Sequence, residues 1–232
     1  MIELLNIDCM EYMKTCEDNA FDLAIVDPPY GIKADKGTGS SNLAKSKKYS
    51  SEWDSSVPSI EYFNELFRIS INQIIWGVNY YPYDLSGGRI VWDKDNTGNF
   101  SDCELAFSSF GYGVRKYKFK WNGMIQGDMK NKEKRIHPTQ KPVALYRWLL
   151  DNYAKPNDRI LDTHAGSFSS AVACKEKGFS GVFCELDKDY FKDGKARVDK
   201  ASRQYELTEV IKETPENIEL FNQHDVGCKA VE

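Results

Sequence analysis

The sequence predicts an α/β fold with a single doubly wound, mostly parallel sheet and an antiparallel edge. Short apolar or β-branched runs end repeatedly in Asp or Gly, and stretches with helical periodicity follow them. Such alternation is typical of a parallel sheet that is covered on both faces. The runs between residues 88 and 121 instead follow one another through turns such as 111–113, which predicts the antiparallel edge. A chain of 232 residues suffices for one such domain with a modest insertion.

The apolar runs predict eight strands and four helices, taken in chain order. The strands are Glu3–Ile7, Asp22–Val26, Ile71–Trp76, Arg89–Trp92, Leu105–Phe110, Arg115–Lys120, Arg159–Asp162 and Gly181–Glu185. The helices are Ser59–Ser70, Pro142–Tyr153, Ser169–Lys177 and Asp187–Arg203. Ser59 is expected to cap the first helix, and Pro142 suits the first position of the second.

Charge is distributed unevenly along the chain, although the net charge is only −4. Residues 33–50 hold five Lys and one Asp, net +4, and residues 115–135 hold eight basic and two acidic side chains, net +6. Residues 204–232 hold seven acidic side chains and two Lys, net −5. Two basic loops are typical of a protein that touches a polyanion, and solvated charged loops are the alternative. We expect one domain over 1–203, with 33–58 and 111–136 as inserted regions and 204–232 as an acidic extension.

Composition excludes several other classes of protein. The chain is 41% apolar and 28% charged, and no apolar run approaches the roughly 18–20 residues that span a bilayer. The first residues lack the features of a secretory signal, so we expect a cytoplasmic protein without a membrane partner. Six scattered Cys without a C-x-x-C pair, together with three His, favour neither disulfides nor a metal site. This also fits a reducing compartment.

The segment Asp27-Pro28-Pro29-Tyr30 follows a buried-looking apolar strand. Ligands of open α/β sheets bind at the carboxyl ends of strands, so chemistry is expected here. The two prolines fix the backbone and remove two N–H donors, which leaves carbonyls free to accept hydrogen bonds. A carboxylate, free carbonyls and a flat ring together suit an amino group on a planar ring. A rigid turn is the alternative, because this composition is also that of turns.

Four segments together resemble a known family. D-P-P-Y after an apolar strand resembles the catalytic motif of DNA amino-methyltransferases, which methylate adenine N6 or cytosine N4 using S-adenosylmethionine. The segment HPTQKP at 137–142 resembles the motif that opens the cofactor half of that family. RILDTHAGSFSS at 159–170 resembles its cofactor loop, and ELD at 185–187 resembles the acidic pair that follows. With NIDC at 6–9, these segments span most of the chain.

The order of these segments is also informative. The catalytic motif comes first, then the basic region, then the cofactor motif, which resembles the β arrangement of the amino-methyltransferases. The resemblance therefore implies a circularly permuted, Rossmann-like S-adenosylmethionine methyltransferase fold. In such a fold both parts of the chain build the cofactor pocket.

Several residues have an expected role toward that cofactor. Gly166 lets the backbone approach the ligand closely, and Ser169 or Ser170 can cap a helix whose amides favour a carboxylate. Glu185 follows Asp162 at a spacing that suits ribose hydroxyls, whereas Asp187 is expected to cap a helix. His164 is expected to bond locally and not to act as a base. The full expected set of cofactor-binding residues is Asp8, Asp27, Thr139, Gln140, Lys141, Asp162, Gly166, Ser167, Ser169 and Glu185, of which the resemblance places Asp8 at the adenine and 139–141 at the amino-acid end.

Phe168 departs from the family, whose loop usually reads Gly-x-Gly. A positive φ at a non-Gly residue costs about 1–2 kcal/mol. Either the loop has shifted, with the Phe168 ring stacked against another group, or the ring crowds the cofactor and lowers its affinity. An inactive relative that binds DNA without methylating it is therefore one alternative.

The resemblance implies methyl transfer to N6 of an adenine in DNA, with cytosine N4 as a further alternative. The base is expected to flip out of the duplex, to stack on Tyr30, and to donate from its amino group to Asp27 and the Pro28 carbonyl. Transfer is expected to be direct, so the catalytic set is Asp27, Pro28, Pro29 and Tyr30. DNA-binding is expected at Lys45, Lys47, Lys48, Lys116, Lys118 and Arg135. A homodimer, a restriction endonuclease partner and the recognition site are left open.

Overall fold

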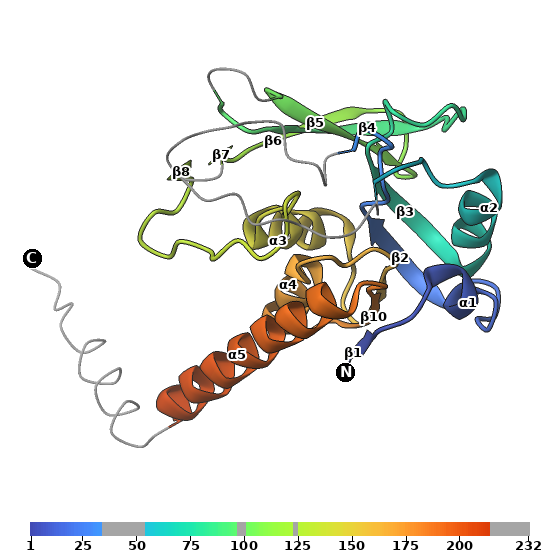
Figure 1. Cartoon of the computed structure of the whole chain (residues 1–232). Helices are drawn as coiled ribbons and strands as arrows, with labels where there is room; N and C mark the ends of the chain where they lie inside the picture. The colour runs from blue at the N-terminus through green and yellow to red at the C-terminus, as the bar shows by residue number, and fades with distance from the viewer. Residues whose placement is uncertain (34–53, 97–100, 123–124, 214–232) are drawn as a thin grey trace, which may run out of the picture.

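The computed structural model of the protein describes residues 1–33, 54–96, 101–122 and 125–213, with the backbone alone over 202–213. An eight-stranded sheet has the order β1-β10-β9-β2-β3-β5-β4-β6 (Figure 1). Of its described strands, β5 alone runs antiparallel to its neighbours. The bounds are β1 Ile2–Leu5, β2 Phe21–Val26, β3 Ser70–Trp76, β4 Gly88–Asp93, β5 Cys103–Ser108, β6 Val114–Lys118, β9 Arg159–Asp162 and β10 Ser180–Cys184. The predicted mostly parallel sheet is confirmed, and its antiparallel strand is β5, two strands in from the edge strand β6.

The permuted strand order is realised in the sheet. The first strand of the chain, β1, pairs in parallel with β10, from Ile2 opposite Gly181 to Leu5 opposite Cys184. Strand β9 lies between β10 and β2, so segments far apart in sequence are neighbours in the sheet. Beyond the strand ends, the Asn6 side chain donates to the carbonyls of Glu185 and Leu186 at 2.8 and 3.0 Å. The two parts of the chain are thus joined where the cofactor motif was expected.

Helices cover both faces of the sheet, as a doubly wound fold requires. Their bounds are α1 Cys9–Met13, α2 Ile60–Ile69, α3 Val143–Tyr153, α4 Ser169–Lys177 and α5 Lys188–Glu213. One buried cluster joins α1 and α2 to the sheet, and a second joins α3, α4 and α5 to its other face (Figure 1). Among the described residues, no helix combines the length and apolar character needed to cross a membrane.

The element predictions need four corrections. Helix α1 was not expected, because its five residues are too few to show a periodicity. The Asp8 side chain caps its N-terminus. Trp121–Asn122 (β7) and Ile125–Gln126 (β8) form a small separate sheet inside the basic region. Pro142 precedes α3 as its N-cap residue and is not its first helical residue. Helix α5 continues to Glu213, so the expected boundary at 203 falls inside a helix.

Two expected regions lie largely outside the described residues. Of the basic segment 33–58, residues 34–53 are not described, and of the acidic extension, residues 214–232 are not described.

Ser59 stands at the N-cap position of α2 as expected, but its side chain makes no capping hydrogen bond to the helix backbone.

Candidate active site

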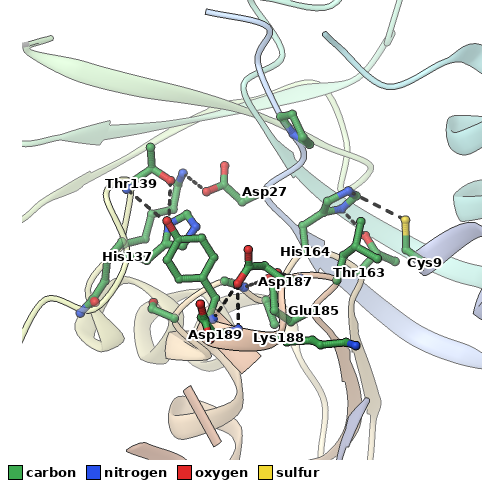
Figure 2. A pocket seen from close by; sticks show the side chains of 18 of the residues that line it. Cys9, Asp27, His137, Thr139, Thr163, His164, Glu185, Asp187, Lys188 and Asp189 are labelled. Carbon is green, nitrogen blue, oxygen red and sulfur yellow. Dashed lines mark hydrogen bonds and ion pairs between the residues drawn. The ribbon is translucent and has the colours of Figure 1, made fainter. Parts of the chain in front are cut away.

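A large cavity opens at the carboxyl ends of β9, β10 and β1 (Figure 2). Its volume of 840 Å³ lies in the range of small-molecule sites, about 300–1,000 Å³. Asp27 lies at the upper side in the view of Figure 2, and Glu185 and Asp187 lie at the lower side. Of the expected cofactor residues, it is lined by Asp8, Asp27, Thr139, Gln140, Lys141, Gly166, Ser167 and Glu185. Eight of ten expected residues are therefore brought together.

A second, smaller cavity of 160 Å³ adjoins the first. A cavity of about 150 Å³ holds a single benzene-sized ring, so this one has room for part of a planar base. Its walls include the whole D-P-P-Y segment together with Tyr80, Lys94 and Glu104. The two cavities share the side chains of Asp27, Pro29, Thr139 and Lys141. Asp27 thus stands at the junction of a large and a ring-sized site.

The Asp27 carboxylate is fixed through both of its oxygens. Its Oδ1 accepts from the Tyr30 hydroxyl at 2.6 Å, and its Oδ2 lies 2.5 Å from Lys141 Nζ. Burial raises the pKa of Asp27 above its ordinary value, the Lys141 ammonium opposes this, and the nearby Glu104 carboxylate raises the pKa further. Asp27 is consequently a carboxylate that binds a proton more readily than an exposed one.

Lys141 joins Asp27 to a second acid. The Lys141 side chain is 2% exposed, and its Nζ lies 2.9 Å from Glu104 Oε2 and 3.0 Å from the Tyr30 hydroxyl. Glu104 also forms an ion pair with Lys94. Burial disfavours the charged form of Glu104, but Lys141 and Lys94 lower its pKa to about 2. The result is a compact cluster of two carboxylates and two ammonium groups on four different segments.

The Pro28 carbonyl, the second expected acceptor, is already in contact with a hydroxyl. Tyr81 is buried, and its hydroxyl lies 3.1 Å from Pro28 O and 2.8 Å from Trp76 O. A hydroxyl carries one proton, so it donates fully to one of these carbonyls at a time. A lone pair of Pro28 O therefore remains for an amino group.

Tyr30 is held in place from several sides. Asp54 Oδ1 accepts from the backbone amides of Tyr30 and Gly31, each at 2.7 Å. The Tyr30 ring stacks on Tyr80, with centroids 4.9 Å apart. Gly77 lies against the same ring, since a Cβ there would be 2.2 Å from Tyr30 Cε1. The ring face that Tyr80 covers becomes available to a base only when Tyr80, which is 39% exposed, moves aside.

The cofactor loop after β9 is tied to the end of β10. Gly166 has a φ of +51°, and its amide donates to Glu185 Oε2 at 2.8 Å. The other carboxylate oxygen, Oε1, accepts from Asp187 N at 2.8 Å. Asp187 Oδ1 accepts from the amides of Asp189 and Tyr190, so the expected capping role of Asp187 on α5 is confirmed. Glu185 thus shapes the loop and also faces the cavity.

Asp8 and His164 also line the large cavity. Asp8 Oδ1 accepts from the amides of Met10 and Glu11 at 2.8 and 3.2 Å, which caps α1. His164 Nδ1 lies 2.9 Å from the Thr163 hydroxyl, and burial lowers the pKa of His164 to about 4. His164 is therefore neutral near pH 7 and bonded locally, as expected.

Asp162 and Ser169 are not among the described residues that line the cavity. Asp162 is fully buried behind it and accepts from His164 N at 3.0 Å and from the Ser170 hydroxyl at 2.5 Å. Burial raises the pKa of Asp162 to about 7. The Ser169 hydroxyl donates to Lys141 O at 2.7 Å. Neither serine caps α4, because the N-cap position belongs to Phe168.

Phe168 takes the left-handed conformation that its position demands, with φ +56° and ψ +30°. Its ring is fully buried and points away from the cavity toward α5. There it packs edge to face against Phe191, with centroids 5.8 Å apart, and fills the space beside Gly194. Of the two alternatives, the structure thus favours the one in which the Phe168 ring packs against another group, and the ring does not line the cavity.

The segment before α3 connects the cavity to the basic region. Thr139 Oγ1 lies 3.2 Å from His137 Nδ1, and Thr139 lines both cavities. Gln140 lines the larger one while its backbone carbonyl accepts from Trp121 Nε1 at 2.8 Å. Trp121 is buried in this contact, so its side chain packs inside the protein and does not face solvent.

Three of the six expected DNA contacts lie on described residues. Lys116 and Lys118 are exposed on the edge strand β6 and pair with Asp93 at 3.5 Å and Asp95 at 2.8 Å. Such exposed pairs contribute little and are readily exchanged for other partners. The exposed Arg135 donates to Pro138 O. Lys45, Lys47 and Lys48 fall outside the described residues.

Sequence reasoning missed three polar residues beside the catalytic motif. Glu104 is an acid within the apolar strand β5, and that contrast was the signal that could have indicated it. Lys94 follows β4 directly. Asp54 is buried and lies 24 residues after Tyr30, whose backbone amide donates to its carboxylate. The sequence offers no comparable signal for these two.

Comparisons with known proteins agree with this geometry. The family model described as DNA methylase, for N6 and N4 enzymes, matches residues 112–196. Type II methyltransferase M.HpaI of Haemophilus parainfluenzae is 26% identical over 93% of this chain and 80% of its own length. DNA adenine methyltransferase YhdJ of Escherichia coli is 37% identical over 33% of this chain and 26% of its own. The crystal structure of the M1.HpyAVI–SAM complex has a TM-score of 0.54 at 21% identity, covering 85% of this chain and all of that one. The chain is thus similar to type II methyltransferases over most of its length, and its residues 112–196 match the N6/N4 DNA methylase model.

Proposed function

We propose that the protein transfers a methyl group from S-adenosylmethionine to N6 of an adenine in DNA. The observation that carries this proposal is the position of Asp27, whose carboxylate lines both the large cavity and the ring-sized one. A methyl donor in the first and a base in the second would meet at this side chain. The identity of 37% with an adenine methyltransferase over 76 residues supports adenine as the base.

The residues of the large cavity fit this cofactor. Five acidic side chains and two lysines line it: Asp8, Asp27, Glu185, Asp187, Asp189, Lys141 and Lys188. An acidic wall favours a positively charged sulfonium, and carboxylates accept hydrogen bonds from ribose hydroxyls and amino groups. We assign Glu185 to the ribose, Asp8 to the adenine amino group, and Thr139 and Ser167 to the amino-acid end, because all four line this cavity. When bound, the cofactor supplies an electrophilic methyl group.

The catalytic motif orients the amino group of the base. Its lone pair is delocalised into the ring, so the nitrogen must be held in a tetrahedral geometry to attack. Asp27 and the Pro28 carbonyl accept from its two hydrogens, which directs the lone pair toward the large cavity. Positioning of this kind, together with the fixed charges around it, supplies the rate. The base must first leave the duplex, since its amino group is out of reach inside the stack.

The test is incubation of the purified protein with duplex DNA and cofactor labelled in its methyl group, followed by digestion to nucleosides. We expect the label in N6-methyladenine. Label in N4-methylcytosine would keep the enzyme class and overturn the choice of base. An unlabelled digest from DNA of mixed sequence, with cofactor bound in calorimetry, would favour the alternative of a binding protein without catalysis.

We expect DNA affinity to fall steeply as the salt concentration rises. The described basic side chains on β6 are exposed and form only weak surface ion pairs, so they can bind phosphates instead. Each phosphate neutralised adds about −0.9 to the slope of log K against log salt. With several contacts, affinity should drop by at least tenfold between 50 and 200 mM salt in fluorescence anisotropy. An affinity that stays constant over this range would contradict a phosphate-binding surface.

A further inference from the structure

Two carboxylates compete for one buried ammonium group beside the proposed target base. Lys141 Nζ lies 2.5 Å from Asp27 Oδ2 and 2.9 Å from Glu104 Oε2, and the side chain is 2% exposed. The Nζ is also 5.5 Å from the Tyr30 ring centroid and 5.4 Å from that of Trp76, distances at which aromatic faces attract a cation. These contacts thus hold the Lys141 ammonium group between the two carboxylates, where it interacts with both.

The two carboxylates differ in their remaining partners. Glu104 has a second ammonium group, Lys94, on its other oxygen. Asp27 has a neutral hydroxyl there, from Tyr30 at 2.6 Å. Two cations therefore stabilise the charge of Glu104, whereas Asp27 shares a single cation. Such an unequal environment separates two acids into one that stays ionised and one that can take up a proton.

The proposed reaction needs a group that takes up a proton at this place. The amine nitrogen forms a bond to the methyl carbon, and the carbon–sulfur bond of the methyl donor breaks with its electron pair on sulfur. The nitrogen is then cationic and must lose one proton. Asp27 accepts a hydrogen bond from that nitrogen in the proposed arrangement, so the proton can pass along the existing bond to its carboxylate.

We propose that Glu104 is a positioning residue, which draws on the Lys141 ammonium and so leaves Asp27 able to accept the proton of the target amine. This inference rests on the proposed function. Glu104 itself stays charged between Lys94 and Lys141 and anchors the ammonium group. Without Glu104, the Lys141 charge would act on Asp27 alone, which would make that carboxylate a weaker proton acceptor.

The direction of each effect on Asp27 follows from the charges that face it. These groups come from several elements and are Lys141, Glu104, Lys94, Tyr30, Tyr81, Tyr146 and Asp162. Burial and Glu104 raise the pKa of Asp27, and Lys141 lowers it. Replacing Glu104 by Gln removes a negative charge, so the pKa of Asp27 should fall. Replacing Lys94 by Met removes a positive charge from this cluster and leaves Glu104 to draw on Lys141 alone, so the pKa of Asp27 should rise.

The experiment measures the Asp27 titration directly and the pH dependence of methylation in parallel. Carboxyl ¹³C resonances of the full-length protein are followed against pH, with the Asp27 signal assigned by its absence from Asp27→Asn. In Glu104→Gln we expect the Asp27 midpoint to move down by about 1 pH unit or more, and in Lys94→Met to move up. The acid limb of kcat/KM should move in the same two directions.

Matched controls use charge pairs outside the site. Glu176→Gln removes the partner of Arg147, and Lys177→Met removes the partner of Asp151. Neither control should move the Asp27 midpoint. A merely loosened site would admit water and lower the midpoint in both test variants, so a downward shift in Lys94→Met would overturn the inference. An unchanged midpoint in Glu104→Gln would do the same at any level of activity. The Asp27 midpoints could shift as expected in a protein that methylates neither adenine nor cytosine. That result would overturn the proposed function but would still support the unequal distribution of charge around the two carboxylates.

Discussion

Replacing Asp27 by Asn should lower kcat for methylation by about 10²–10⁴-fold, the range typical of a lost acid–base group. The amide keeps the shape of the side chain but carries no charge, and its nitrogen cannot accept from the target amine. It also cannot take up the proton that the methylated nitrogen must lose. Initial rates with labelled cofactor at saturating DNA measure the effect.

Asn is preferred to Ala at this position because of Lys141. Asp27→Ala would leave a 2% exposed ammonium group with Glu104 as its remaining carboxylate partner, and breaking buried pairs is costly. Cofactor affinity in calorimetry should stay within about tenfold, ~1.4 kcal/mol, in Asp27→Asn. Asp151→Asn, at an exposed pair with Lys177, is the matched control and should retain full activity. Methylation by Asp27→Asn at the wild-type rate would refute the catalytic assignment.

Replacing Gly194 by Ala should destabilise the protein by about 1–3 kcal/mol, the usual cost of overpacking a core. A Gly→Ala change inside an unhindered helix has the opposite sign and stabilises by about 0.8–1 kcal/mol. In α5, however, the new Cβ would lie 2.1 Å from Cδ2 of the Phe168 ring. That ring is fully buried, so it cannot move aside into solvent. Chemical denaturation with a fitted midpoint and slope measures the change.

The same substitution should reverse its sign when the ring is removed. In a Phe168→Ala background the space beside residue 194 is empty, so Gly194→Ala should then stabilise relative to Phe168→Ala alone. The difference between the two backgrounds is the coupling energy of a double-mutant cycle. Additive effects would show that Phe168 does not occupy the space that Gly194 leaves. Cofactor affinity should fall in Gly194→Ala alone, because displacement of Phe168 pulls on the adjoining Gly166 and Ser167.

The strand order and the main site could be predicted because their signals are local or lie in motifs. The apolar run before Asp27 identifies a buried strand, and the parallel sheet then places Asp27 and Gly166 at one edge. Helix α1 escaped prediction, since five residues do not complete two turns. Its cap, Asp8, was expected only to bind cofactor.

The rest of the site depends on pairings that sequence does not reveal. Glu104 reaches Lys141 because β5 pairs antiparallel with β3, from Ile74 opposite Ser108 onward, and this register has no local signature. The direction of the Phe168 ring was undecided for a similar reason. The direction is set by Gly194, which lies 26 residues after Phe168 in the sequence. The two residues come into contact only because α4 packs on α5.

The pairing of β1 with β10 has a consequence for synthesis of the protein. Asn6 and Glu185 are 179 residues apart in the chain and in direct contact in the structure. While a ribosome is still making the first half, β1 and β2 lack the two strands that lie between them, and their backbone edges stay open. Contacts of such long sequence separation also slow folding. We therefore expect the large cavity of the nascent chain to form late, after β9 and β10 have been made and can pair between the strands made first.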